Sequence, residues 1–378
     1  MKEIKGLLKT HPAVFSVGRD YQIMVPVKEK CIMWVEVDGV RYYDSSNGIN
    51  RSETPVHRMM LPMAVLDKAK KYTLGYRKII NRKPYFPELE DEVCVDYGFR
   101  PIESENINIY HISDTHNLIK SPVEAGKYFD NKGEALDLLV LNGDIPDHSG
   151  TVENFDTVYE IVSRLTQGGI PTVFSRGNHD LRGLCAEAFA DYTPSDKGAS
   201  YYTLRVGPIW AILLDCGEDK PDTNAEYGGT IDCHSFRLAQ TDFLKKVIEN
   251  AKDEYEADGV KYKLVISHVP FSHKLEPPFD IEPEIYTEWC KLLGESVKPD
   301  LMISGHLHRC FTAMPGSGFD TYGQPCPVIV GSTLIRPNKE KDIDEGFVGC
   351  ALTLEKKSAK VVFNKNDGTI SGEEAISL

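Results

Sequence analysis

The sequence lacks any apolar run long enough to cross a bilayer, which takes about 20 consecutive apolar residues. It also lacks an apolar stretch of signal-peptide length ahead of His11. Its nine cysteines are scattered and include no Cys-x-x-Cys pair, so neither a disulfide framework nor a cysteine zinc motif is indicated. These absences predict a cytoplasmic protein with reduced thiols and no membrane association.

Positive charge is also in short supply. The 43 Lys and Arg residues are outnumbered by 57 Asp and Glu residues, which gives a net charge of -14. This balance disfavours a broad phosphate-tracking surface, so a polymeric nucleic acid is not the expected partner. Bound metal ions would reverse the sign locally. The remaining composition, 41% hydrophobic and 26% charged over 378 residues, is that of a globular protein with two or three domains.

The first hundred residues carry short strand patterns and tight turns. Cys31 to Val37 and Val40 to Tyr43 are β-rich runs joined by Asp38-Gly39, a strong hairpin signal because both positions tolerate positive φ. No segment there has a convincing helical period. We therefore expect a small antiparallel β-sandwich over residues 1–103.

Residues 56–77 resemble the late strands of fibronectin type III modules, in which an alternating strand leads through a turn into a Tyr-rich strand. The segment Pro101 to Asn106 has the character of a linker, and the second domain is expected over residues 104–378. The sandwich is either a structural flank or a recognition module, and the flank is the simpler hypothesis.

Strand and helix patterns alternate in the second part of the chain. Ile107 to Ser113, Ala135 to Leu141 and Ile170 to Phe174 are short apolar runs typical of buried strands, and Val152 to Leu165 has the apolar spacing of a helix. This β-α-β order predicts a mainly parallel sheet with ligands gathered at the carboxyl ends of its strands. Further strands are expected up to His268 and up to Gly305.

Polar, metal-competent residues follow five of these predicted strands. Singly, each has an ordinary explanation, because Asp at a strand end is often a helix N-cap and a lone His is usually a satisfied rim residue. Five such strand ends in order indicate one shared site. The residues are Asp114 and His116, Asp144, Asn178 with His179 and Asp180, His268, and His306 with His308.

These blocks resemble the full signature of the calcineurin-like metallophosphoesterases. They are Asp114-x-His116, Gly143-Asp144, Gly177-Asn178-His179-Asp180, His268 and Gly305-His306-x-His308, and the resemblance covers roughly residues 105–335. It implies an αββα sandwich, two central mixed sheets flanked by helices, that holds two metal ions. It also implies a first metal bound by Asp114, His116, Asp144 and His308, and a second bound by bridging Asp144 with Asn178, His268 and His306.

A β-sandwich ahead of this domain is similar to the plan of purple acid phosphatases. Their second block continues Gly-Asp-x-x-Tyr, and the tyrosinate binds Fe(III). Here the block is Gly143-Asp144-Ile145-Pro146-Asp147, without the tyrosine. The sequence is therefore closer to the Gly-Asp-x-x-Asp block of bacterial phosphodiesterase branches.

The ligand types themselves favour Mn²⁺, Zn²⁺ or iron over Mg²⁺ or Ca²⁺. Two such ions about 3.5–4 Å apart can share a hydroxide that attacks phosphorus. His179 is expected to donate a proton to the leaving group, with Asp180 orienting its imidazole. Arg176 and Arg309 flank two motifs and are candidates for binding a substrate phosphate.

The expected function is hydrolysis of a phosphomonoester or phosphodiester in a small molecule. The loops over residues 217–234 and 271–283 leave strand ends on the same side and are expected to wall the pocket. A catalytically silent scaffold that binds a protein partner is the alternative, and an unbroken ligand set with His179 argues against it. Oligomeric state is not predicted.

Overall fold

A computed structural model describes residue 4, residues 6–337 and residues 344–378. Its largest sheet has ten strands, and this sheet joins the two ends of the chain. In spatial order its main path is β23 (Ile370–Ser377), β22 (Ser358–Lys365), β21 (Gly346–Glu355), β11 (Ile107–Ile112), β12 (Leu138–Asn142), β13 (Pro171–Ser175), β1 (Ala13–Val17), β2 (Asp20–Pro26) and β7 (Val56–Pro62), with β20 (Thr333–Ile335) paired to β21.

Two smaller sheets pack against the large one. The six-stranded sheet has the order β14 (Tyr202–Val206), β15 (Ile209–Leu213), β16 (Tyr262–Ile266), β17 (Leu301–Ser304), β19 (Val328–Val330) and β18 (Phe311–Ala313). The five-stranded sheet has the order β10 (Val93–Gly98), β8 (Lys71–Asn81), β3 (Cys31–Val37) and β4 (Val40–Tyr43), with β9 (Glu88–Leu89) on β8. A separate two-stranded pair is formed by β5 (Ser45–Ser46) and β6 (Ile49–Asn50).

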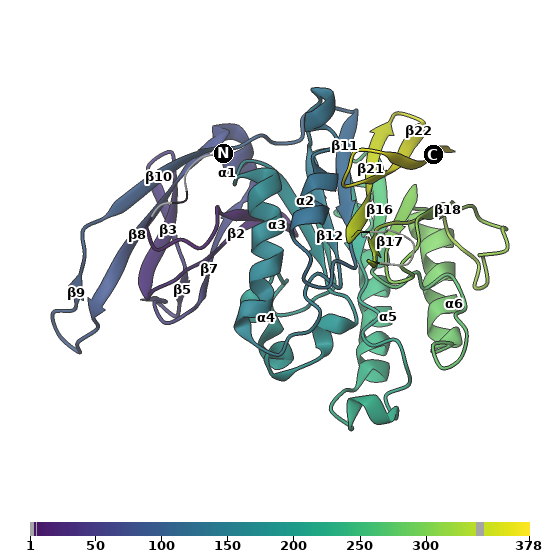
Figure 1. The fold of residues 1–378 in the computed structure, drawn as a ribbon, viewed down its shortest axis with the longest axis horizontal. Coiled ribbons are helices and arrows are strands. Elements are labelled where there is room, and N and C mark those ends of the chain that lie inside the picture. The colour runs from purple at the N-terminus through teal and green to yellow at the C-terminus, as the bar shows by residue number, and fades with distance from the viewer. Residues whose placement is uncertain (1–3, 5, 338–343) are drawn as a thin grey trace.

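Helices cover the outer faces of the two central sheets. The α-helices are α1 (Met63–Ala69), α2 (Lys120–Gly126), α3 (Asp156–Thr166), α4 (Phe189–Tyr192), α5 (Cys233–Glu249) and α6 (Pro283–Leu292). Shorter turns are η1 (Asp130–Lys132), η2 (Val152–Phe155), η3 (His179–Leu181), η4 (Leu184–Ala188), η5 (Ala225–Tyr227) and the π-helical η6 (Leu293–Val297). Figure 1 shows the five-stranded sheet at one end of the molecule and α5 and α6 towards the other.

Three apolar cores hold these layers together. One lies between the sheets and includes Ile109 of β11 and Leu264 of β16. A second lies between the large sheet and α2 and α3, where Val158, Ile161 and Val162 form the buried side of α3. A third lies under α5 and α6. The predicted αββα sandwich with an all-β N-terminal region is confirmed.

The N-terminal strands are shared between two sheets. Strands β3, β4, β8 and β10 form the second layer of a sandwich, as expected, but β1, β2 and β7 extend the large sheet. The join is a parallel pairing of β1 with β13, in which Val14 faces Pro171 and Phe15 faces Thr172. The boundary near residue 103 stays a prediction, because sheet pairing and the inter-sheet core both cross it.

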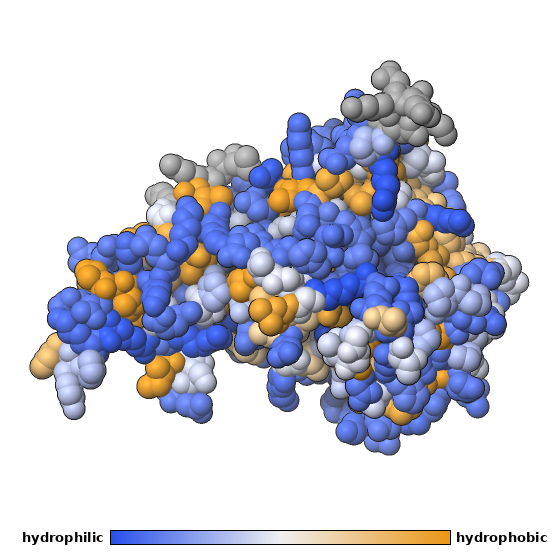
Figure 2. All heavy atoms as spheres, turned by 60° about the horizontal axis from the view of Figure 1, so that its bottom comes forward, coloured by the Kyte–Doolittle hydropathy of each residue, from blue (hydrophilic) through white to orange (hydrophobic). Residues whose placement is uncertain are grey.

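The outer surface is mainly polar. The face drawn in Figure 2 is largely hydrophilic, with apolar side chains in small separate groups. Among the residues that the structure describes, no helix combines the length and the apolar character that crossing a bilayer requires.

Candidate metal centre

Five strand ends meet at one edge between the two central sheets. Strands β11, β12 and β13 run parallel in one sheet, and β16 and β17 run parallel in the other, so each set delivers its carboxyl ends together. The side chains that follow these strands form three overlapping clusters, within each of which one nitrogen or oxygen atom of every residue lies within 4.8 Å of the others. The clusters are Asp114–His116–His308, His116–Asp144–His179 and Asp144–His268–His306.

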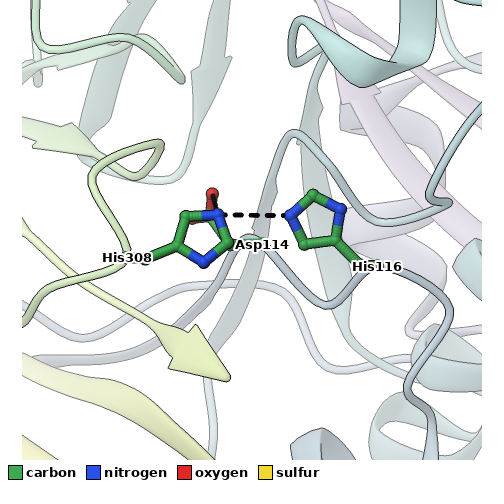
Figure 3. Close-up of side chains that lie close together, drawn as sticks. All are labelled: Asp114, His116 and His308. Carbon is green, nitrogen blue, oxygen red and sulfur yellow. Dashed lines mark hydrogen bonds and ion pairs between the residues drawn. The ribbon is translucent and has the colours of Figure 1, made fainter. Parts of the chain in front are cut away.

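The first cluster is built from the two sheets together. His308 Nε2 lies 3.5 Å from Asp114 Oδ1 and 3.3 Å from His116 Nε2. Figure 3 shows these three side chains close together, with Asp114 and His116 on the loop after β11 and His308 on the loop after β17. His116 Nε2 lies 4.0 Å from Asp144 Oδ2, which connects this cluster to the second one. The four residues that the family resemblance assigns to a first metal ion therefore lie side by side, and their role as ligands stays a prediction.

The third cluster surrounds the buried imidazole of His268. Its Nε2 lies 3.2 Å from Asp144 Oδ2 and 3.8 Å from Asp114 Oδ1. Its Nδ1 donates to the carbonyl of Asn142 at 2.7 Å, which fixes the ring and leaves Nε2 directed at the carboxylates. The Asn178 amide lies 3.0 Å from His306 Nδ1. All seven residues that the sequence proposes as metal ligands are therefore brought together.

The loops that carry these residues hold unusual backbone angles. Asp114, His116, Asp144, His306 and His308 all have positive φ, between 43° and 68°. Such angles are sparsely populated by residues other than glycine, and they cluster at functional sites, where the surrounding structure holds them.

Motif glycines let these loops approach one another closely. A Cβ on Gly177 would overlap the carboxylate and backbone of Asp144, and one on Gly305 would overlap the side chains of Ser113 and Asp114. Only glycine leaves that space, so Gly177 and Gly305 allow the loops to pack closely around the site.

The charges at the centre call for a cation. Asp114 and Asp144 are almost completely buried, and their side-chain ion pairs are with imidazoles. Burial opposes protonation of His268, but Asp144 and then Asp114 raise its pKa to about 10. Burial would raise the pKa of Asp144, yet His268 and the other imidazoles hold it below the ordinary value.

The remaining imidazoles suit metal binding. Burial, with the charge of His268, lowers the pKa of His306 to about 4, and burial also lowers the pKa of His116. Both rings are therefore neutral near pH 7, as metal ligands must be. Two carboxylates, an amide and four imidazoles are donors that fit Mn²⁺, Zn²⁺ or iron.

His179 and Asp180 differ from the sequence expectation in how they contact each other. His179 Nδ1 lies 2.9 Å from the backbone carbonyl of Asp147 and donates to it. The carboxylate of Asp180 instead accepts from the backbone N–H of Gly177 at 2.7 Å and of Asp144 at 3.3 Å. Burial and the charge of Asp144 also raise the pKa of Asp180. Asp180 therefore shapes the turn, and Asp147 takes the orienting contact that the sequence assigned to Asp180.

The two arginines proposed from sequence are placed differently from each other. Arg176 Nε donates to buried Asp215 at 2.6 Å, and its guanidinium lies over the rings of Phe189 and Phe236. Its Nε–H is thus engaged inside the protein. Arg309 is exposed beside His308 and stays a candidate for contact with substrate.

Sequence reasoning missed Arg182 and Asp147 as contacts of the centre. Arg182 Nη1 lies 3.3 Å from His179 Nε2, and Asp147 Oδ1 lies 3.1 Å from His116 Nδ1. The spacing in the sequence could have indicated Arg182. It stands three residues after His179, and residues three apart lie on the same side of a 3-10 helix such as η3.

The loop over residues 217–234 lines a cavity next to the centre. The cavity has a volume of about 410 Å³ and is bounded by Arg182 and Leu184 on one side and by Glu218, Glu226 and Tyr227 on the other. In the second loop, over residues 271–283, Phe271 is completely buried in the core under α5 and α6.

The model of the family described as calcineurin-like phosphoesterase matches residues 107–310, more than half of the chain. This chain belongs to the calcineurin-like phosphoesterase family. The matched segment begins at β11 and ends just after His308, so it contains the whole set of clustered residues. No curated protein matches the phosphoesterase in sequence.

Comparison with solved structures finds matches to this chain at low sequence identity. Purple acid phosphatase PPD1, isolated from yellow lupin (Lupinus luteus) seeds, has a TM-score of 0.61 and 12% identity over 97% of this chain and 74% of that one. GAP50, the anchor in the inner membrane complex of Plasmodium, has a TM-score of 0.46 and 14% identity over 72% and 89%. Vacuolar Protein Sorting 29 from Cryptosporidium parvum has a TM-score of 0.36 and 10% identity over 72% and 99%.

Proposed function

We propose that this protein hydrolyses a phosphomonoester or phosphodiester of a small molecule with the help of two divalent metal ions. The observation that supports it most is the convergence of seven donor side chains from five strand ends, five of them on strained backbone. A fold that served only as a scaffold would gain nothing from holding these residues in this way.

Each residue of the centre has a proposed role. Asp114, His116, Asp144 and His308 hold one ion, and Asp144 with Asn178, His268 and His306 holds the other. When bound, such ions lower the pKa of a coordinated water towards neutrality and offset negative charge on a phosphoryl group. Mn, Zn and Fe are the candidate metals.

His179 is the proposed proton donor to the leaving oxygen. Its Nδ1 is occupied by the Asp147 carbonyl, so Nε2 is the nitrogen that exchanges a proton with substrate. The ring stands 4.6 Å from that of His116, beside the proposed ligands. General acid catalysis is worth about 10²–10⁴-fold, and His179→Ala is expected to lower turnover within that range without loss of metal.

Metal analysis with a substrate screen tests the proposal. The purified protein is expected to hold about two metal ions per chain and to cleave p-nitrophenyl phosphate or bis(p-nitrophenyl) phosphate with Mn²⁺, Zn²⁺ or Fe²⁺ added. Asp114→Asn and His308→Ala should lose both metal and activity. Absence of bound metal together with absence of hydrolysis under every condition would favour the scaffold hypothesis.

A further inference from the structure

Arg182 is held rigidly beside the metal centre by a buried carboxylate. Its Nε and Nη2 donate to the two oxygens of Glu218 at 2.8 and 2.9 Å. The Glu218 side chain is only 1% exposed, whereas that of Arg182 is 25% exposed. A two-point contact of this kind fixes the plane of the guanidinium, so its remaining N–H groups point in defined directions.

Those remaining N–H groups face the proposed active site through longer contacts. Nη1 lies 3.3 Å from His179 Nε2 and 3.4 Å from Glu226 Oε1. These contacts exceed the usual lengths of charge-assisted hydrogen bonds, so a phosphoryl oxygen could replace them at little cost.

The neighbours of Arg182 connect it to both the centre and the cavity. Asp219, next to Glu218, has its Oδ2 at 3.9 Å from His306 Nε2. On its other side Arg182 lines the cavity of about 410 Å³. A phosphoryl group at the metal ligands would therefore lie beside this guanidinium, with room for the rest of the ester in the cavity.

We propose that Arg182 binds a non-bridging phosphoryl oxygen of the substrate through Nη1, and that Glu218 positions it to do so. The inference rests on the proposed function for the location of the phosphoryl group. It replaces Arg176 in that role, since the guanidinium of Arg176 is already engaged by Asp215. It also predicts that His179 and Arg182 contact the same phosphoryl group, because their nitrogens lie 3.3 Å apart.

A purely structural role for Arg182 makes a different prediction. In that case the Arg182–Glu218 pair would only pin the loop over residues 217–234 to η3, and its loss would lower stability without changing affinity for an anion. Affinity for inorganic phosphate separates the two possibilities, because it measures contact with the phosphoryl group and does not require turnover.

The experiment measures binding of inorganic phosphate to the metal-loaded protein by calorimetry, with metal content determined for each variant. Arg182→Ala should bind phosphate about 10- to 100-fold more weakly than the unmodified protein at equal metal content. Added guanidinium ion should restore part of the affinity, which a structural role would not predict. The phosphate affinity of Arg182→Lys should lie between those of Arg182→Ala and the unmodified protein. Glu218→Gln keeps the arginine, so it should weaken phosphate binding less than Arg182→Ala does.

The matched control is Arg164→Ala, which removes an exposed arginine paired with Glu160 on α3 and should leave phosphate affinity unchanged. Equal phosphate affinity of Arg182→Ala and the unmodified protein would overturn the proposal, as would a lack of phosphate binding by the unmodified protein. Phosphate binding that depends on Arg182 in a protein without esterase activity would overturn only the proposed function. Esterase activity with unchanged affinity in Arg182→Ala would overturn only this inference.

Discussion

Asp147 contacts two imidazoles of the centre through different atoms. Its carboxylate accepts from His116 Nδ1, and its backbone carbonyl accepts from His179 Nδ1. It occupies the position at which the purple acid phosphatase block has a tyrosine. Asp147, which stands where a tyrosine ligand would be, thus orients His116 and His179 without itself belonging to the proposed metal ligands.

Substitution of Asp147 should separate these two contacts. Asp147→Ala removes the carboxylate but keeps the carbonyl, so metal affinity should fall by about 10- to 100-fold while turnover at saturating metal changes little. Asp147→Asn is the control. It keeps an acceptor oxygen, so its metal affinity should fall less than that of Asp147→Ala. Competition titration with a chromophoric chelator measures the affinity, and a fall in turnover with unchanged metal affinity would contradict the assignment.

His111 is a buried residue whose titration should influence stability. Both ring nitrogens are buried without a hydrogen-bond partner, and burial, aided by the charge of His268, lowers its pKa from 6.5 to about 3. Below pH 6.5 the unfolded chain binds a proton at His111 that the folded chain does not. Stability contributed by the neutral ring is therefore complete above pH 6.5 and declines by about 1.4 kcal/mol per pH unit down to about pH 3.

The variant His111→Leu tests this pH dependence. It should be less sensitive to acid than the unmodified protein between pH 6.5 and pH 4, with the gap in unfolding free energy widening as the pH falls. Urea unfolding of both proteins in the presence of a chelator makes the comparison. Both proteins are then free of metal, so metal release contributes to neither unfolding curve. Parallel dependence of both proteins on pH would contradict the role of His111.

At the scale of elements, the loops after the strands do the positioning. Positive φ at five residues and close approach at Gly177 and Gly305 turn short strands into a compact ring of donors. The strands bring the loops to one edge of the sheets, and the strained turns then bring the donor atoms close together.

The substitution Gly177→Ala should disturb the ligands without touching any of them chemically. Its Cβ would overlap Asp144, so metal content should fall, and stability should fall by about 1–3 kcal/mol. Gly318→Ala is the matched control, because a Cβ there meets nothing within 4 Å. Metal analysis and thermal unfolding measure both effects, and retention of the full metal content by Gly177→Ala would contradict the argument.

The elements of the site could be predicted because each motif is local. Strand, turn and donor lie within ten residues of one another, as at β11 with Asp114 and His116 or at β17 with His306 and His308. A segment of that length is enough to recognise the spacing of apolar residues, the residues that form the turn and the types of ligand side chain.

Contacts between distant segments could not be predicted in the same way. The partner of Arg176 is Asp215, and the partner of Arg182 is Glu218; both stand more than 30 residues further along the chain. The pairing of β1 with β13 is equally invisible in the sequence, since both are ordinary buried strands. Such partners depend on how the layers pack, which local propensity does not encode.

At the scale of the whole molecule, the N-terminal region is tied to the phosphoesterase core along its length. Beyond the β1–β13 pairing, Lys9 pairs with Asp156, Gln22 bonds to the backbone of Ser195, and Tyr72 donates to the carbonyl of Gly168. These contacts cross the predicted boundary near residue 103 and indicate that the two parts stabilise each other.

Removal of residues 1–103 should therefore prevent folding. The truncated chain would lose β1, β2 and β7 and expose the edge of β13, and an exposed sheet edge promotes aggregation. Soluble yield and gel filtration, compared with the full chain, measure the outcome. A monomeric, metal-binding fragment of residues 104–378 would show instead that the second part folds independently.

The pairing of β1 with β13 also has a consequence for synthesis on the ribosome. Val14 is made early, yet its partner Pro171 emerges more than 150 residues later. One edge of the first strand pairs with β2 at once, but its other edge must wait unpaired until the third strand of the core has left the exit tunnel, so the N-terminal region cannot be completed as the chain is translated. Closing so long a loop slows folding, and the waiting strand is a natural substrate for chaperones.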